Sequence, residues 1–240
     1  MLVFPRIHQN RQLSAKTIVQ WALLGLVALF LAGCAGVDRG TVDITDFNRV
    51  VVDAGHGGHD SGAISRGRRR IAEKEMALDL ARRLERHLQN AGFQTEMTRT
   101  GDRFVSLDER VAISNRRRKS LFVSIHFNDS RKRGIHGAEI YHNGVGTFGL
   151  VRKLEHALGR VPGCRVRLTR TASYRVLRKS GGPAVLLECG YLSNPAELAR
   201  CMRAEYRERM AAAIAQAIVE QRGGPPGAAA SGEGAYRRSS

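Results

Sequence analysis

The sequence predicts a single α/β domain whose twisted, mostly parallel sheet carries helices on both faces. Short β-rich runs alternate with helical patterns, which is typical of βαβ units. Residues 47–222 show this alternation, and a block of that length suits one domain with one core. The composition, with 42% apolar and 25% charged residues, excludes disordered, collagen-like and coiled-coil chains.

The first elements form one βαβ unit. A strand pattern over 49–53 precedes a helical pattern over 73–91, which Gly92 ends, and a second strand pattern covers 93–98. The flanking segments differ in composition from this block: residues 34–46 have the polar, turn-rich character of a tether. We expect a parallel pair of strands at the start of the domain.

The alternation then continues to the end of the block. Ser106 and Glu109 form a capping box for a helix that reaches about Arg118, and residues 121–126 suit a buried strand. The remaining expected elements are a strand over 135–142, a helix capped by Thr147 that runs to Gly159, a strand over 184–188 and a helix over 204–221. The Gly-, Pro- and Ala-rich residues 223–240 are expected to be a flexible tail.

Four polar residues stand where these elements open onto one end of the sheet. His56 follows the first strand, His126 ends the strand over 121–126, and Glu188 ends the strand over 184–188. Glu73 begins the first helix on the same side. Because ligands of open α/β sheets bind beyond the carboxyl ends of the strands, we expect these four side chains to converge.

Two imidazoles and one carboxylate are a common ligand set for catalytic zinc, and a second carboxylate nearby could act as base. Each residue alone also has an ordinary interpretation: His126 would be a core histidine, and Glu73 a carboxylate favoured by the helix dipole. His56 lies in a Gly-rich loop, but the loop lacks the Gly-Lys-Ser/Thr ending of a phosphate loop. Glu188 follows a buried apolar run, where a carboxylate is costly unless it is paired or bound to metal. Together the four favour a metal site.

Several ordered motifs resemble those of the zinc-dependent N-acetylmuramoyl-L-alanine amidases. They are VVDAGHGGHDSGA (51–63), EKE (73–75), SLDER (106–110), SIHFN (124–128) and PAVLLECGYLSN (183–194). The resemblance covers roughly residues 48–221. It implies that His56, Glu73 and His126 bind one zinc ion and that Glu188 is the catalytic glutamate, with Glu75 as an alternative to Glu73 two residues away.

The resemblance also implies a reaction, which is hydrolysis of the amide between N-acetylmuramic acid and L-alanine in peptidoglycan. Glu188 would take a proton from the attacking water and return one to the leaving nitrogen. Two other functions stay open: a catalytically silent lipoprotein that binds the cell wall, and a zinc hydrolase that cuts within the peptide stem. Phe127, where the family has a smaller residue, could narrow the substrate groove.

The N-terminal 33 residues have the layout of an export signal. Basic residues precede an apolar run from Trp21 to Ala32 that is too short to span a bilayer comfortably. The segment Leu31-Ala32-Gly33-Cys34 resembles a bacterial lipoprotein cleavage box, which implies that Cys34 becomes the acylated N-terminus. An uncleaved signal anchor and an ordinary core run are the alternatives. Ala35 after the cysteine favours the outer membrane, so we expect a lipid-anchored periplasmic protein.

The chain is strongly basic, with a formal net charge of +17. Three of these charges lie in residues 1–33, so 17 minus 3 leaves +14 on the remainder. An export signal makes nucleic acid an unexpected partner. Peptidoglycan stems and anionic lipid head groups are the expected ones, and we expect a monomer.

Two expectations concern regulation and redox state. Relatives with an inserted, site-blocking helix carry it between the second histidine and the catalytic glutamate, and residues 126–188 leave no spare helical segment here, so no activator is expected. Three cysteines follow Cys34, and an odd number leaves one unpaired. A bridge between Cys164 and Cys201 is the pairing considered, with buried free thiols as the alternative.

Overall fold

The structure, a computed structural model, describes residues 44–66 and 70–224. The predicted signal sequence, Cys34, most of the predicted tether and nearly all of the predicted tail lie outside the described residues. Within the described part of the chain, no helix is both long and apolar enough to cross a membrane.

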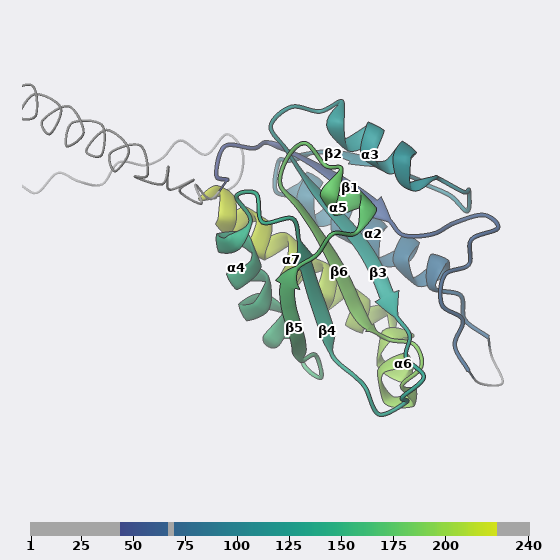
Figure 1. Cartoon of the computed structure of the whole chain (residues 1–240). Helices are drawn as coiled ribbons and strands as arrows, with labels where there is room; N and C mark the ends of the chain where they lie inside the picture. Colours follow the sequence, from purple (N-terminus) through teal and green to yellow (C-terminus); the bar gives the residue numbers. More distant parts are fainter. Residues whose placement is uncertain (1–43, 67–69, 225–240) are drawn as a thin grey trace, which may run out of the picture. The chain divides into compact units, whose positions relative to one another are not determined.

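The domain is built on one six-stranded sheet with the order β2-β1-β3-β6-β4-β5 (Figure 1). Neighbouring strands are parallel except β4 and β6, which run antiparallel. The strands are β1 (Arg49–Ala54), β2 (Gln94–Met97), β3 (Ser120–Asn128), β4 (Ala138–His142), β5 (Val166–Thr171) and β6 (Ala184–Tyr191). The mostly parallel sheet confirms the predicted fold class.

Helices cover both faces of the sheet, as predicted. The face that we call the helical face carries α2 (Glu73–Asn90), α4 (Phe148–Gly159) and α7 (Ala204–Arg222). Of the helices in the described residues, α3 (Leu107–Asn115) and the one-turn helix α5 (Arg175–Arg178) lie on the opposite face, called the cleft face. The short helix α6 (Pro195–Cys201) follows β6.

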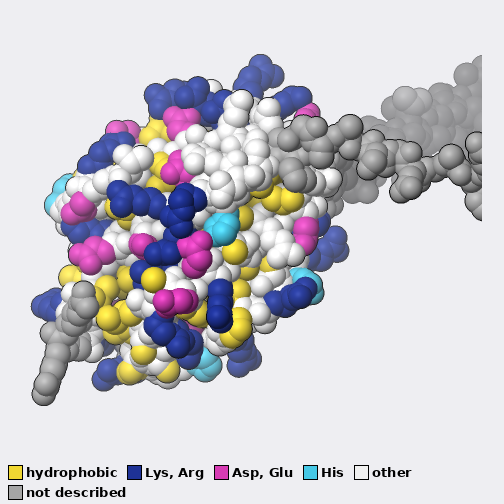
Figure 2. Space-filling model, turned by 180° about the vertical axis from the view of Figure 1, so that it is seen from behind, with side chains coloured by type: hydrophobic (Ala, Val, Ile, Leu, Met, Phe, Trp, Pro, Cys, Tyr) yellow, Lys and Arg dark blue, Asp and Glu magenta, His cyan; other side chains and the backbone are white. Residues whose placement is uncertain are grey.

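Basic and acidic side chains intermingle on the surface rather than forming one continuous basic patch in the view of Figure 2. Ion pairs join α2 to α7, with Arg83 Nη1 2.5 Å from Glu208 Oε2 and Arg207 paired with Asp79. Such exposed pairs each stabilise a fold only slightly. The packing of apolar side chains beneath them carries most of the stability of the helical face.

Strand alternation assigns residues to the two faces. Alternate residues of β3 on the helical face stay apolar along the whole strand, for example Leu121, Val123 and Ile125, and all three are fully buried. The cleft-face residues of the same strand change from Phe122 to polar residues toward its carboxyl end. This change brings functional groups to one end of one face.

Several predicted boundaries were wrong by a few residues. The strand expected from 135 begins at Ala138, the helix expected to reach Arg118 ends at Asn115, and β6 extends past Glu188 to Tyr191. Thr147 precedes α4 but makes no side-chain cap, because its hydroxyl pairs with His142 Nδ1 at 2.9 Å.

Three elements were not predicted: β5, α5 and α6. The edge strand β5 reads VRLTRT and is only partly buried, so it lacks the apolar run of a central strand. The helices α5 and α6 have four and seven residues, too few for a helical period to show. The three cysteines among the described residues, Cys164, Cys189 and Cys201, are free thiols, so the alternative of unpaired cysteines holds and the Cys164–Cys201 bridge considered from sequence was wrong.

Candidate active site

The loop after β1 presents His56 through an unusual backbone conformation. His56 has φ 59°, and the glycines on its C-terminal side also have positive φ, which residues with a Cβ rarely adopt. Gly55 is required for another reason: a Cβ there would lie 2.4 Å from Cε1 of His126. The Gly-rich sequence therefore allows the two imidazoles to approach each other.

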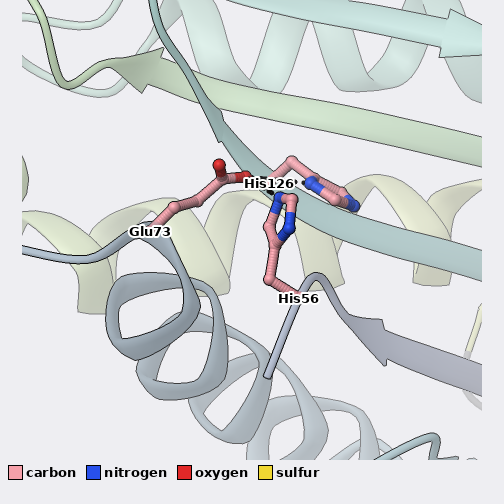
Figure 3. A group of neighbouring side chains, drawn as sticks. All are labelled: His56, Glu73 and His126. Atoms are coloured by element: carbon pink, nitrogen blue, oxygen red, sulfur yellow. Dashed lines mark hydrogen bonds and ion pairs between the residues drawn. The ribbon is translucent and has the colours of Figure 1, made fainter. Parts of the chain in front are cut away.

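His56, Glu73 and His126 converge from three separate elements (Figure 3). Glu73 Oε1 lies 3.0 Å from His56 Nε2 and 2.9 Å from His126 Nδ1. One potential ligand atom from each residue lies within 4.8 Å of the others, so the group could hold a metal ion. We call these residues the ligand triad.

The backbone holds Glu73 in place at the start of α2. Its Oε2 accepts a hydrogen bond from Ala63 N at 2.9 Å, and its Oε1 accepts one from Phe127 N at 3.0 Å. A Cβ at Gly62, where φ is +62°, would lie 2.5 Å from Glu73 Oε2. Glu75 is exposed and stands outside the group. The structure thus brings Glu73, and not Glu75, to the two histidines.

Asp60 orients His56 from the side away from the triad. Its Oδ2 lies 2.9 Å from His56 Nδ1, which leaves Nε2 to face Glu73. A carboxylate on the second ring nitrogen fixes the orientation of a metal-binding imidazole and raises its basicity. The Gly62 backbone N–H in turn donates to Asp60 Oδ1 at 3.1 Å. Asp60 is a supporting residue to which the sequence analysis gave no role.

Glu188 lies beside the ligand triad without belonging to it. It pairs in register with His126 on β3 and with Glu139 on β4, so the three side chains share the cleft face. Its Oε2 is buried and has no hydrogen-bond partner. Burial raises the pKa of Glu188 to about 7; the carboxylates of Glu73 and Glu139 add to this rise and the charge of His126 opposes it. A carboxyl group with such a pKa can both take and give a proton near neutral pH.

Hydrogen bonds within the triad shift the pKa values of Glu73 and His126 in opposite directions. Burial alone would raise the pKa of Glu73, but hydrogen bonds to His126 and His56 outweigh it and hold that pKa far below its usual range. Burial would lower the pKa of His126, and the hydrogen bond to Glu73 outweighs this and raises the pKa to about 9. Glu73 is therefore an ionised carboxylate, and a metal ion would have to displace the proton that His126 shares with it.

A buried ion pair supports the loop that carries His56. Arg110 Nη1 lies 2.6 Å from Asp53 Oδ1, and both side chains are almost fully buried. The same guanidinium donates to the carbonyl oxygens of Ala54 at 2.6 Å and His56 at 2.8 Å. Burial alone would raise the pKa of Asp53, but Arg110 and hydrogen bonds from the Ser124 and Thr98 hydroxyls hold it below its usual range. The pair thus links α3 to the end of β1.

The triad and Glu188 open into a cleft with a volume of about 590 Å³. Its floor comes from the ends of β1, β3 and β6, and its walls come from the segments around Phe104 and Tyr174. A cleft of this size can take a small molecule or one segment of a polymer. The four residues predicted from sequence are therefore brought to one cavity.

The fold and the site define an α/β protein that can bind a metal ion through two histidines and a glutamate beside a second, buried glutamate. A family model described as N-acetylmuramoyl-L-alanine amidase matches residues 50–220. The chain belongs to this family.

Individual relatives agree with this assignment. LytC of Bacillus subtilis, an N-acetylmuramoyl-L-alanine amidase, is 32% identical over 174 residues, which cover 71% of this chain and 34% of LytC. The chain thus spans about a third of the length of that relative. Among solved structures, the catalytic domain of CwlV from Bacillus (Paenibacillus) polymyxa is 34% identical with a TM-score of 0.69, covering 72% of this chain and 97% of that domain. AmiC2 of Nostoc punctiforme is 36% identical with a TM-score of 0.68, and the match covers 72% of this chain and 95% of the AmiC2 chain.

Proposed function

We propose that the protein is a zinc-dependent hydrolase of the amide bond between N-acetylmuramic acid and L-alanine in peptidoglycan. The observation that carries this proposal is the ligand triad next to the buried, unpartnered carboxylate of Glu188 in one cleft. Family membership supplies the substrate class. The physiological role would be remodelling of the cell wall or separation of daughter cells.

The residues present fit zinc. Two imidazoles and one carboxylate are a donor set that zinc binds with a position left for water or substrate. Asp60 behind His56 and the two backbone N–H groups that hold Glu73 supply the outer contacts that such ligands need. When bound, zinc supplies Lewis-acid activation of the amide carbonyl and of water.

Glu188 supplies the proton transfers in this mechanism. Glu188 lines the cleft beside the triad, so its carboxylate can take a proton from the attacking water, and no protein group competes for its Oε2. With a pKa near 7 it can then deliver that proton to the alanine nitrogen as the C–N bond breaks. One residue thus acts as base and then as acid, and water supplies the hydroxyl of the new carboxylate.

Digestion of purified sacculi by the full chain tests this function. Mass analysis should find sugar-free peptides with an N-terminal alanine and glycan strands that retain the lactyl group. Cuts inside the stem would support a stem-cutting zinc hydrolase instead. Binding to sacculi without release of any product would support a silent wall-binding protein.

We also propose that acylation of Cys34 anchors the protein to the outer membrane, with the domain in the periplasm. Two or more acyl chains make such anchoring stable. Cys34→Ser should move the protein out of the membrane fraction after a high-salt wash, whereas Cys164→Ser, which alters a thiol within the folded domain, should not. Normal processing and membrane retention of the Cys34 variant would contradict the anchor.

We further propose that the enzyme needs no activator. The cleft of about 590 Å³ that contains Glu188 and the triad supports this proposal. The full chain should digest sacculi equally well with and without periplasmic extract. Digestion only in the presence of extract would contradict it.

A further inference from the structure

The cleft has two walls of different chemistry. Three of the large hydrophobic side chains that are exposed in the described part of the chain line it: Phe104, Leu107 and Tyr174, with exposed fractions of 44%, 51% and 44%. Exposed apolar side chains gathered at one cavity mark a ligand surface. Phe104 and Leu107 belong to one wall, and Tyr174 belongs to the other.

The first wall, residues 58–60 and 102–107, is aromatic and its charges are paired. The Phe104 ring stacks on His59 with centroids 4.2 Å apart and an interplanar angle of 28°. Asp102 lies 2.7 Å from Lys74 Nζ, and Asp60 is engaged with His56. We call this the Phe104 wall. Arg103, the remaining charged residue of this wall, does not line the cleft; it lies 3.9 Å from Glu109 and donates to the Thr98 carbonyl oxygen. The wall therefore presents a mainly aromatic surface to the cleft.

The second wall, residues 170–179, is cationic. This segment contains Arg170, Arg175, Arg178 and Lys179 and no acidic residue. Arg175 is the member that lines the cleft, together with Tyr174. The other three cations form no ion pair with any carboxylate in the described residues. We call this the α5 wall.

Arg175 is available to a ligand although it has a partner. It forms a two-pronged pair with Asp108 on α3, with distances of 2.8 and 2.7 Å, but both side chains are largely exposed. Exposed ion pairs of this kind are weak, so a substrate carboxylate can replace or share the contact. Arg110, the other guanidinium among the described residues that line the cleft, is buried and bound to Asp53, Ala54 and His56.

The two walls match the two ends of the proposed substrate. The acyl side of the scissile amide is a neutral sugar. The C–H groups of its ring can pack on an aromatic face, because the electrostatic potential of that face is negative. The amine side is a peptide that carries carboxylates, which a guanidinium binds in a fork geometry. We propose that the cleft binds its substrate in one orientation, with the sugar against the Phe104 wall and a stem carboxylate at Arg175. This inference rests on the proposed function.

A pair of synthetic substrates tests the orientation. They are N-acetylmuramoyl dipeptides whose second residue is either glutamate or glutamine, so that they differ in one carboxylate. Arg175→Gln should raise KM for the glutamate substrate about tenfold and leave the glutamine substrate nearly unchanged. A merely structural role of Arg175 would change both substrates alike, and an equal change would overturn the proposal.

Two control variants separate charge from structure. Asp108→Asn breaks the same contact between α3 and α5 but leaves the cation, so KM for the glutamate substrate should stay the same or fall. Arg152→Gln removes an exposed charge on α4 and should change neither substrate. A rise in KM for Asp108→Asn as large as that for Arg175→Gln would assign the effect to the lost contact and overturn the proposal.

The Phe104 wall has its own expected result. Phe104→Ala should raise KM for the glutamate and glutamine substrates by the same factor, and Phe104→Tyr should keep KM near that of the unaltered chain. Phe148→Ala, the matched variant at an exposed position on α4, should leave KM for both substrates unchanged. A loss confined to the glutamate substrate would overturn the orientation. If the unaltered chain hydrolyses neither substrate, the proposed function fails as well; normal hydrolysis without the selective effect of Arg175→Gln removes this inference alone.

Discussion

The two faces of the sheet are built in different ways. On the helical face, side chains such as Leu84, Leu154 and Ile214 are fully buried among three long helices. On the cleft face, a small apolar cluster that includes Phe122 and Leu177 lies next to buried polar groups. The helical face is held by packing, whereas the cleft face depends on hydrogen bonds and one buried ion pair.

This difference shows how one sheet can serve two needs. Metal ligands and a proton-transferring carboxylate are costly inside a protein unless partners are arranged around them. The cleft face meets this cost with Arg110, Asp53 and the backbone groups that bind Glu73. The helical face carries no such groups on β3 and supplies the stability that offsets the cost.

The largest stability effect is expected at the buried ion pair of the cleft face. Arg110→Ala should lower the free energy of unfolding by about 3–5 kcal/mol, because it leaves the Asp53 carboxylate buried without its partner. Urea unfolding measures the change. Arg116→Ala, at an exposed position on the same segment, is the control and should change stability little. A loss below about 1 kcal/mol for Arg110→Ala would break the contrast between the faces.

The helical face should respond to loss of packing more strongly than the cleft face. Leu84→Ala removes a fully buried side chain between α2 and its neighbours and should cost about 2–5 kcal/mol. Leu186→Ala, on the cleft face of β6, removes the same atoms but should cost only about 2 kcal/mol, because the site already borders the cavity. Equal losses in urea unfolding would show that packing is shared evenly between the faces.

Acid should weaken the cleft face through Asp53. In the folded state the pKa of Asp53 is held below its usual value. Its contribution to the free energy of unfolding is therefore complete above the unfolded-state pKa of about 3.9 and is lost as the pH falls through the folded-state pKa. Stability of the unaltered protein should therefore fall with decreasing pH in that range. The stability of the Asp53→Asn variant should fall less steeply over the same pH range. An identical slope for the variant and the unaltered protein would contradict the assignment of this pH dependence to Asp53.

The smallest effect is expected at the start of α3. The Ser106 hydroxyl accepts a hydrogen bond from Glu109 N at 3.2 Å, and Glu109 Oε2 accepts one from Ser106 N at 3.3 Å, so Ser106→Ala should cost about 1 kcal/mol. Ser106→Asp should keep most of the cap. If Ser106→Ala and Ser106→Asp changed the melting temperature by the same amount, the capping box would contribute little to the stability of the cleft face.

The sequence predicted the four central residues because they lie at the ends of regular elements. His56 follows β1, His126 and Glu188 lie near the carboxyl ends of β3 and β6, and Glu73 begins α2. The carboxyl ends of parallel strands meet at one edge of a sheet. Asp60 and Arg110 were not assigned roles. The contact of Arg110 with Asp53 joins residues 57 positions apart, and no local pattern records such a pairing. The signal for Asp60 was present four residues after His56, but in a turn whose geometry follows from several positive φ values.

The walls of the cleft could not be predicted for a related reason. The α5 wall begins in the partly buried edge strand β5, whose only charged residues are two arginines, and it ends in a single helical turn; neither has a clear hydrophobic period. Its cations were visible as residues, but their place beside the cleft depends on how β4 and β5 cross to the far side of β6. Long-range topology, and not local propensity, places this wall.

The most direct test of the central claim compares His126→Ala with Glu188→Gln in the full chain. Metal content and hydrolysis of a muramoyl peptide are measured on the same samples. We predict that His126→Ala loses both bound zinc and hydrolysis, whereas Glu188→Gln keeps one zinc ion per chain and loses about 10²–10⁴-fold in kcat. Near-normal turnover by Glu188→Gln, or full zinc content in His126→Ala, would contradict the division of the site into a ligand triad and a separate base.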